Sequence, residues 1–297
     1  ITILGIPFNC TNVAQFTWTR RDGSTITRSI AQEWQNYANW HHYYYGRMKM
    51  AKASVSRAFA GLGPNFRVGY RTINNNNTFD IPVGTDGGRF RGSNKSTFYT
   101  RLFATGTPGA TPLRRALDDA GQYFSQTDAG GPYGPESGSA QITCRQNFTI
   151  LTTDGAWNSS GASTTGAQTN TDGTDGPTIT NPTTGQSYTY RAVFPYTDSR
   201  TNTLADVAMY YWKNDLRPLM DNNVPTSSSN PAFWQHMRTF GISIGEQGNV
   251  NPAGPYPAGG WPNPDNNARK IDDLLHASLN SRGRFIVAAD PEAFTTA

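Results

Sequence analysis

Short apolar, β-branched runs alternate along this chain with longer segments whose apolar residues recur every three or four positions. The first pattern is typical of buried strands and the second of amphipathic helices. Strands are expected at 147–153, 239–245 and 284–288, each followed or preceded by a helical pattern. Such alternation predicts an α/β fold with a mainly parallel sheet, flanking helices and right-handed crossovers.

The clearest helical pattern covers residues 30–60. Its apolar and aromatic residues recur at spacings of four and three, which draws one continuous stripe. We expect one long helix whose stripe faces the core, with His41 packed in it. Further helices are expected over 94–104 and from Ile271 to Ser278. Another opens at Thr111-Pro112-Leu113, with Pro112 just inside its start, and another begins at a capping box formed by Thr203 and Asp206.

The remaining segments predict smaller elements and long polar loops. Strands are expected at 1–6 and 66–70, and a hairpin over 16–27. A low-complexity loop runs from Ser159 to about Ser187. Its Asp172-Gly-Thr-Asp-Gly176 stretch is only a fragment of an EF-hand pattern, without the alternating ligands and the closing Glu, so no calcium loop is expected there.

Composition narrows the class of protein. The net charge is +4 and no dense Lys/Arg run exists, so nucleic acid is not an expected partner. No stretch is long enough for a transmembrane helix, and no membrane span is expected. Few thiols and abundant Asn, Gly and Thr suit an exported protein. Cys10 and Cys144 would then form a disulfide, with two buried free thiols as the alternative. The chain is expected to be a piece of a longer exported protein.

Two polar residues are predicted to meet at one edge of the sheet. Asp154 directly follows the apolar run 147–153, and Thr111 stands at a loop-to-helix junction. Open α/β sheets bind ligands at the carboxyl ends of their strands. A hydroxyl and a carboxylate suit Mg²⁺ or Ca²⁺, whereas zinc would call for a His/Cys cluster that does not accompany them. An ordinary Asp-Gly turn after a strand is the alternative.

These residues carry a resemblance to known families. Ala110–Leu117 and Phe148–Gly155 resemble the von Willebrand factor A-type (Rossmann-like) domain, which carries a metal-ion-dependent adhesion site. Over about residues 30–294 the chain resembles the PilC/PilY family of type IV pilus tip proteins. The motifs behind the second resemblance are Ala38–Trp40, Cys144–Phe148, Leu204–Trp212, Trp234–Met237, Lys270–Ala277, Gly283–Phe285 and Ala289–Pro291.

The resemblance implies an adhesin and pilus-assembly factor at the pilus tip, exported through the periplasm and outer membrane, that supports adhesion and twitching motility. Its partners would be minor pilins and a host-cell or abiotic surface ligand. Residues 1–29 would form an arm or insertion and residues 30–297 the A-type domain, with long loop insertions and a β-propeller beyond residue 297. Thr111 and Asp154 would be the second and third elements of the adhesion site.

One departure from the family pattern limits the metal site. The first element, Asp-x-Ser-x-Ser at the end of the first strand, does not occur in this chain. It would lie upstream of Ile1 or be lost, which leaves the Mg²⁺ or Ca²⁺ site incomplete here. A purely structural scaffold on the minor pilin complex is the alternative function. Exposed aromatics among Trp157, Tyr188, Tyr190 and Trp261 could be its anchors, with burial under loops as the alternative for each of them.

An enzyme is not expected. The chain has four histidines, and no His-Glu-x-x-His motif or close carboxylate pair with acid/base roles. A metal-assisted hydrolase built on Asp154 is the remaining catalytic hypothesis.

Overall fold

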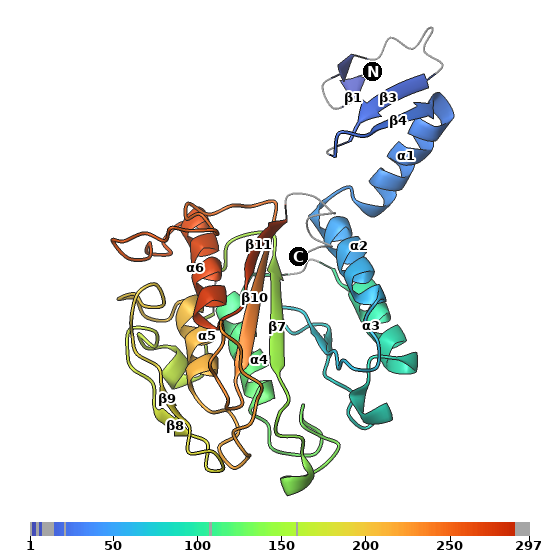
Figure 1. Cartoon of the computed structure of the whole chain (residues 1–297). Helices are drawn as coiled ribbons and strands as arrows, with labels where there is room; N and C mark the ends of the chain where they lie inside the picture. The colour runs from blue at the N-terminus through green and yellow to red at the C-terminus, as the bar shows by residue number, and fades with distance from the viewer. Residues whose placement is uncertain are drawn as a thin grey trace.

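The structure is a computed structural model that describes residues 2–3, 6–7, 15–20, 22–106, 109–158 and 160–288. A parallel sheet stands at the centre of the fold (Figure 1). Its three strands are ordered β11-β10-β7, and β10 is parallel to both neighbours. The strands are β7 (Asn147–Thr153), β10 (Met237–Ile244) and β11 (Phe285–Ala288). The predicted α/β class with a parallel sheet is confirmed.

Helices α4 (Leu113–Phe124), α5 (Leu204–Lys213) and α6 (Asn267–Asn280) pack on one face of this sheet. Helix α5 is buried on almost every side, as is typical of a helix that is apolar all round. It begins at the predicted capping box, in which Thr203 and Asp206 exchange hydrogen bonds. The core beneath these helices includes Leu117, Leu151, Val207, Met237 and Leu274.

Helices α2 (Arg47–Ala60) and α3 (Gly92–Ala104) lie on the opposite side of the sheet (Figure 1). Met50 of α2 packs with Ile242 and Ile244 of β10, near the carboxyl ends of the strands. A second cluster surrounds Phe98 of α3. It includes Phe59 near the end of α2, Tyr70 and Phe90 from the segment between α2 and α3, and Leu102 of α3 itself.

The outer edge of β7 has no partner strand among the described residues. Two large side chains of β7, Phe148 and Ile150, are 47% and 51% exposed. Because side chains alternate along a strand, both point away from the face that buries Leu151. The sheet therefore presents an open edge beside an uncovered apolar surface.

The expectation of one continuous helix over 30–60 is wrong. Helix α1 (Ile30–Tyr43) ends before α2 begins, and Gly46 between them has φ +89°, a value that interrupts a right-handed helix. No residue of α1 is buried. His41 is exposed and stacks on Tyr45, with ring centroids 4.8 Å apart, so its predicted place in the core is wrong too. The α2 part of the stripe packs on the core through Ala51 and Val55, whereas no residue of the α1 part is buried.

The amino-terminal arm joins α1 and lies apart from the sheet (Figure 1). Its predicted hairpin is confirmed: β3 (Gln15–Thr19) pairs antiparallel with β4 (Thr25–Ser29). The expected strand at 1–6 is instead a pair of two-residue strands, β1 (Thr2–Ile3) and β2 (Ile6–Pro7). The domain boundary after residue 29 stays a prediction.

The long loops contain short elements that the sequence pattern did not reveal. The expected strand at 66–70 is reduced to β5, and the low-complexity loop holds a hairpin and buries Ala167, Thr171 and Asp172. Pro112 stands just outside α4, not inside it. The short elements are β5 (Tyr70–Arg71), β6 (Thr78–Phe79), β8 (Thr178–Thr180), β9 (Ser187–Thr189), η1 (Asp86–Gly88), η2 (Gly138–Ala140) and η3 (Thr165–Ala167).

Candidate functional site

The loops of Thr111 and Asp154 meet beside the carboxyl end of β7. The backbone N–H of Asn158 donates to the Thr111 carbonyl over 2.9 Å, and the Thr111 N–H donates to the Asn158 side-chain oxygen over 2.8 Å. This double hydrogen bond fixes the loop after β7 against the start of α4. The two predicted site residues therefore belong to one edge of the sheet, while metal binding by them stays a prediction.

Asp154 has a cationic neighbour at this edge. Its side chain is 60% exposed, and the Arg47 guanidinium lies 3.9 Å from its carboxylate and donates to its backbone carbonyl over 2.9 Å. Arg47, at the start of α2, also pairs with Glu246 after β10. A divalent cation bound to Asp154 would thus face the positive charge of Arg47.

A polar hollow of about 480 Å³ opens next to these loops. Trp157 and Arg114 line one side of it, and the guanidinium carbon of Arg114 lies 4.0 Å above the indole ring. Residues 199–203 and the Asn263-Pro264 pair line the other side. Trp157 itself is buried, as are Tyr190 and Trp261, so none of these three predicted anchors is exposed.

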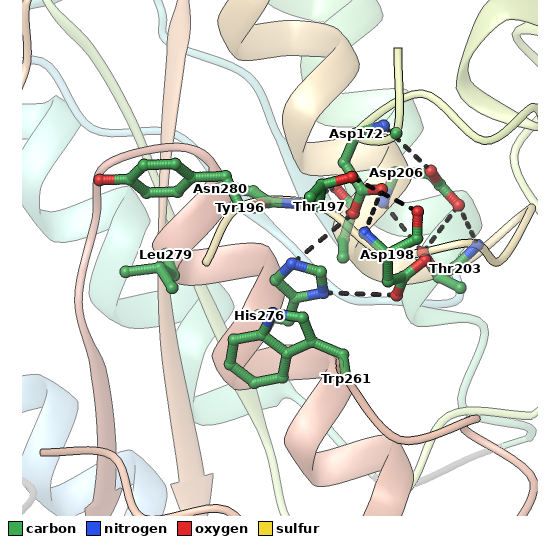
Figure 2. Close-up of polar contacts among 12 residues, drawn as sticks. Asp172, Tyr196, Thr197, Asp198, Thr203, Asp206, Trp261, His276, Leu279 and Asn280 are labelled. Atoms are coloured by element: carbon green, nitrogen blue, oxygen red, sulfur yellow. Dashed lines mark hydrogen bonds and ion pairs between the residues drawn. The ribbon is translucent and has the colours of Figure 1, made fainter. Parts of the chain in front are cut away.

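A buried polar network lies behind the hollow, around the start of α5 (Figure 2). Asp206 accepts hydrogen bonds from the Thr203 N–H and hydroxyl and from the Thr171 N–H, which tie the low-complexity loop to α5. Burial raises the pKa of Asp206 to about 6, against the effect of these donors. Through these hydrogen bonds, Asp206 holds together two segments that are distant in the sequence.

Within this network, two carboxylates flank one imidazole. His276 of α6 lies with Nε2 3.6 Å from Asp172 Oδ2 and with Nδ1 3.6 Å from Asp198 Oδ2. Asn280, one turn further along α6, donates to the same Asp172 oxygen over 3.0 Å. The ring of Trp261 stacks on the imidazole at 4.1 Å between centroids, which fixes the plane of the His276 ring.

Burial shifts every titratable group of this cluster toward its neutral form. Burial and the neighbouring carboxylates of Asp198 and Asp206 raise the pKa of Asp172 to about 8. Burial also raises the pKa of Asp198, and it lowers the pKa of His276 to about 3. The histidine is therefore neutral, and one of its nitrogens carries a lone pair.

Sequence reasoning does not find this cluster. In the sequence, Asp172 stands out only as part of an incomplete calcium loop and His276 only as one residue of the Lys270–Ala277 motif, while Asp198 does not stand out. No spacing rule links the three positions, since two of them lie in irregular loops. The predicted disulfide stays a prediction: Cys144 is exposed, and Cys10 lies outside the described residues.

Comparison with curated proteins shows which known proteins the chain is similar to. It is 31% identical to the type IV pilus biogenesis factor PilY1 of Pseudomonas aeruginosa strain PAO1 over 330 aligned residues, which cover 97% of this chain and 27% of that protein. PilY1 of strain PAK is 31% identical over 91% of the chain and 26% of the relative. The chain belongs to the PilY1 family. PilY1 of strain UCBPP-PA14 is 32% identical over 88% of the chain.

The chain spans about a quarter of the length of these PilY1 relatives. No protein-family model matches it. No solved structure matches it either, and the A-type assignment stays a prediction. Among the described helices, none combines the length and apolar character that a membrane crossing requires.

Proposed function

We propose that the chain is part of an exported factor at the tip of a type IV pilus, where it supports pilus assembly, surface adhesion and twitching motility without catalysing a reaction. The observation that carries this proposal is the similarity to PilY1, a named type IV pilus biogenesis factor, along 97% of the chain. Minor pilins would be its partners at the tip, and a host-cell or abiotic surface its ligand.

The exposed stripe on α1 supports a partner-binding role. Trp34 is 56% exposed, and Tyr37 and Trp40 beside it are exposed as well. Their rings contact one another, at 6.2 Å between Trp34 and Tyr37 and 5.9 Å between Tyr37 and Trp40. Exposed aromatic rows of this kind are typical of protein interfaces. We propose that α1 presents this row to a pilus component.

We propose further that the fold is an A-type domain. The parallel order β11-β10-β7 and the loops of Thr111 and Asp154 at its carboxyl edge support this assignment. The free edge of β7 beside exposed Ile150 would accept a further strand from outside residues 1–297. Mg²⁺ or Ca²⁺ would bind at Thr111 and Asp154 once an upstream Asp-x-Ser-x-Ser element and a ligand carboxylate complete the shell.

The alternative is a purely structural scaffold without metal-dependent ligand binding. The contact between Arg47 and Asp154 favours it, because the guanidinium already supplies positive charge where the cation would sit.

A deletion strain tests both functions. Complementation with the wild-type gene should restore sheared surface pili, adhesion and twitching zones, whereas a deletion strain that keeps all three would contradict the pilus role. W34A/W40A should lower piliation if α1 contacts a pilus component. D154A should abolish cation-dependent adhesion but spare piliation, with D265A as the matched exposed control. Normal adhesion in D154A would favour the alternative function, a structural scaffold without metal-dependent ligand binding.

A further inference from the structure

The cluster of Asp172, Asp198 and His276 is built from three separate segments and has little access to solvent. The side chains of His276 and Asp172 are 1% and 0% exposed, and one ligand atom from each of the three residues lies within 4.8 Å of the others. Among the described residues, the ionic contacts of both carboxylates are with this imidazole. A buried pair of carboxylates needs a compensating charge or a proton.

The imidazole offers an unused donor atom to this space. Nε2 of His276 has no hydrogen-bond partner, although the side chain is only 1% exposed. It faces Asp172 Oδ2 at 3.6 Å, beyond the distance of a hydrogen bond, and Nδ1 faces Asp198 Oδ2 at the same distance. A neutral imidazole keeps a lone pair on one of its two nitrogens, and with the proton on Nδ1 that lone pair is on Nε2. The arrangement calls for a cation.

The donor atoms select the kind of cation. Ca²⁺ and Mg²⁺ take oxygen ligands, whereas Zn²⁺ binds imidazole nitrogen and carboxylate oxygen together. In a tetrahedral zinc site with bonds of about 2.0–2.1 Å, neighbouring ligand atoms stand about 3.4 Å apart. The separation of 3.6 Å between Nε2 and Asp172 is close to this value. Asp198 would supply the third ligand atom, which lies within 4.8 Å of one from each of the other two residues.

We propose that Asp172, Asp198 and His276 form a buried structural site for a borderline divalent metal ion, of which Zn²⁺ fits best. The stacked indole of Trp261, at 4.1 Å between centroids, holds the imidazole in the plane that such a ligand needs. The ion would fasten the low-complexity loop and the segment before α5 to α6. Asn280, which donates to Asp172, would position that carboxylate.

Metal titration of the purified chain tests the site. After chelation with EDTA and dialysis, ZnCl₂ should bind at one ion per chain in calorimetry and raise the unfolding midpoint, while MgCl₂ and CaCl₂ should do neither. H276Q should lower the zinc affinity by more than about a hundred-fold, beyond the loss typical of outer-shell changes. H41Q makes the same substitution at an exposed histidine and should bind zinc like the wild type.

X-ray absorption at the zinc edge covers the case in which H276Q does not fold. In the wild-type chain it should show one imidazole nitrogen and carboxylate oxygens around zinc, and D198N, which changes a side chain at the margin of the cluster, should lose stoichiometric zinc. The proposal is overturned if the chelated wild type takes up no zinc, if H276Q or D198N binds it as tightly as H41Q, or if the absorption spectrum contains no imidazole. Those results would leave a shared proton between Asp172 and His276 as the bridging charge.

Discussion

Asp273 of α6 accepts a hydrogen bond from the indole N–H of Trp157 over 2.9 Å, which joins the loop after β7 to the helix layer. The same carboxylate accepts the backbone N–H groups of Leu204 and Ala205, at 2.9 and 3.1 Å, where α5 begins. It therefore places a negative group at the positive end of a buried helix and ties three segments together.

Replacing this carboxylate should weaken the fold. In D273N, one side-chain oxygen remains for three donors, and the amide group cannot accept. We expect the free energy of unfolding to fall by about 2–3 kcal/mol, as for lost hydrogen bonds to a buried charged group. Urea unfolding of wild type and D273N, followed by tryptophan fluorescence, measures this difference in the free energy of unfolding.

D265N is the matched control, because Asp265 is half-exposed and pairs with Arg269 on the surface. Its effect should stay below about 1 kcal/mol. Equal effects of the two variants would show that the carboxylate of Asp273 does not fasten α5.

His236 should make the fold sensitive to mild acid. Its Nδ1 lies 2.6 Å from the Trp234 carbonyl and therefore carries the proton, while Nε2 accepts from Asn230 over 2.9 Å. Burial lowers the pKa of this ring from 6.5 to about 4. Below pH 6.5 the unfolded chain takes up a proton that the folded chain refuses, so His236 lowers the free energy of unfolding by up to about 3 kcal/mol as the pH falls to 4.

The measurement is urea unfolding of wild type and H236N at pH 7, 6 and 5. Asparagine keeps a donor near the Nδ1 position but does not titrate, so H236N should lose less stability over this range. The difference between the two proteins isolates His236 from the buried carboxyls of Asp206 and Asp273, whose raised pKa values act in the opposite direction. Parallel pH profiles would contradict the prediction.

A glycine in α4 should resist replacement by alanine. A Cβ on Gly121 would lie 2.3 Å from the ring of Tyr211, whose hydroxyl donates to buried Asp118 over 2.7 Å. Helix propensity alone favours alanine by roughly 0.5–1 kcal/mol. Overpacking should reverse that sign, so that G121A loses about 1–3 kcal/mol in thermal or urea unfolding.

Gly61 provides the comparison. It lies at the end of α2 with φ −78°, and no atom stands within 4 Å of the place that an alanine Cβ would take. G61A should leave the free energy of unfolding unchanged or raise it by a few tenths of a kcal/mol, roughly as for other compatible sites. A stabilised G121A would mean that Tyr211 yields its place without cost.

Replacing a tryptophan should change the free energy of unfolding little where the ring is exposed and strongly where it is buried. W34A removes an exposed ring of α1 and should change the free energy of unfolding by less than about 0.5 kcal/mol. W212A removes a ring that is fully buried and packs against Tyr190 and Trp234, and it should cost about 3–5 kcal/mol. A large loss in W34A, measured by calorimetry, would show that α1 is covered by the rest of the chain.

The strands of the sheet could be predicted because each is a short, apolar run rich in β-branched residues. The meeting of the Thr111 and Asp154 loops also followed from the rule that parallel strands share a carboxyl edge. The helix over 30–60 could not be predicted correctly. Its spacing predicts an apolar stripe, but whether a stripe lies in the core or on the surface depends on what packs against it, and the described elements beside α1 leave none of its residues buried.

The buried cluster lay beyond sequence reasoning for a different reason. Asp172 and Asp198 belong to irregular loops, where position in space does not follow from position in the chain. His276 stands among apolar residues of α6, where a histidine is usually a packed side chain. Only the fold brings the three together, and only the orientation of the ring shows that Nε2 lacks a partner.

The parallel arrangement of β7, β10 and β11 has a mechanical consequence. In such a sheet, tension applied along the strands pulls on all the cross-strand hydrogen bonds together, so they must shear at once and cannot unzip one after another. In the proposed role, retraction of a pilus whose tip is attached would load this region in tension. The central strand β10 pairs with β7 over Met237–Ser243 and with β11 over Gly241–Ile244, so such a pull would have to break hydrogen bonds on both of its sides.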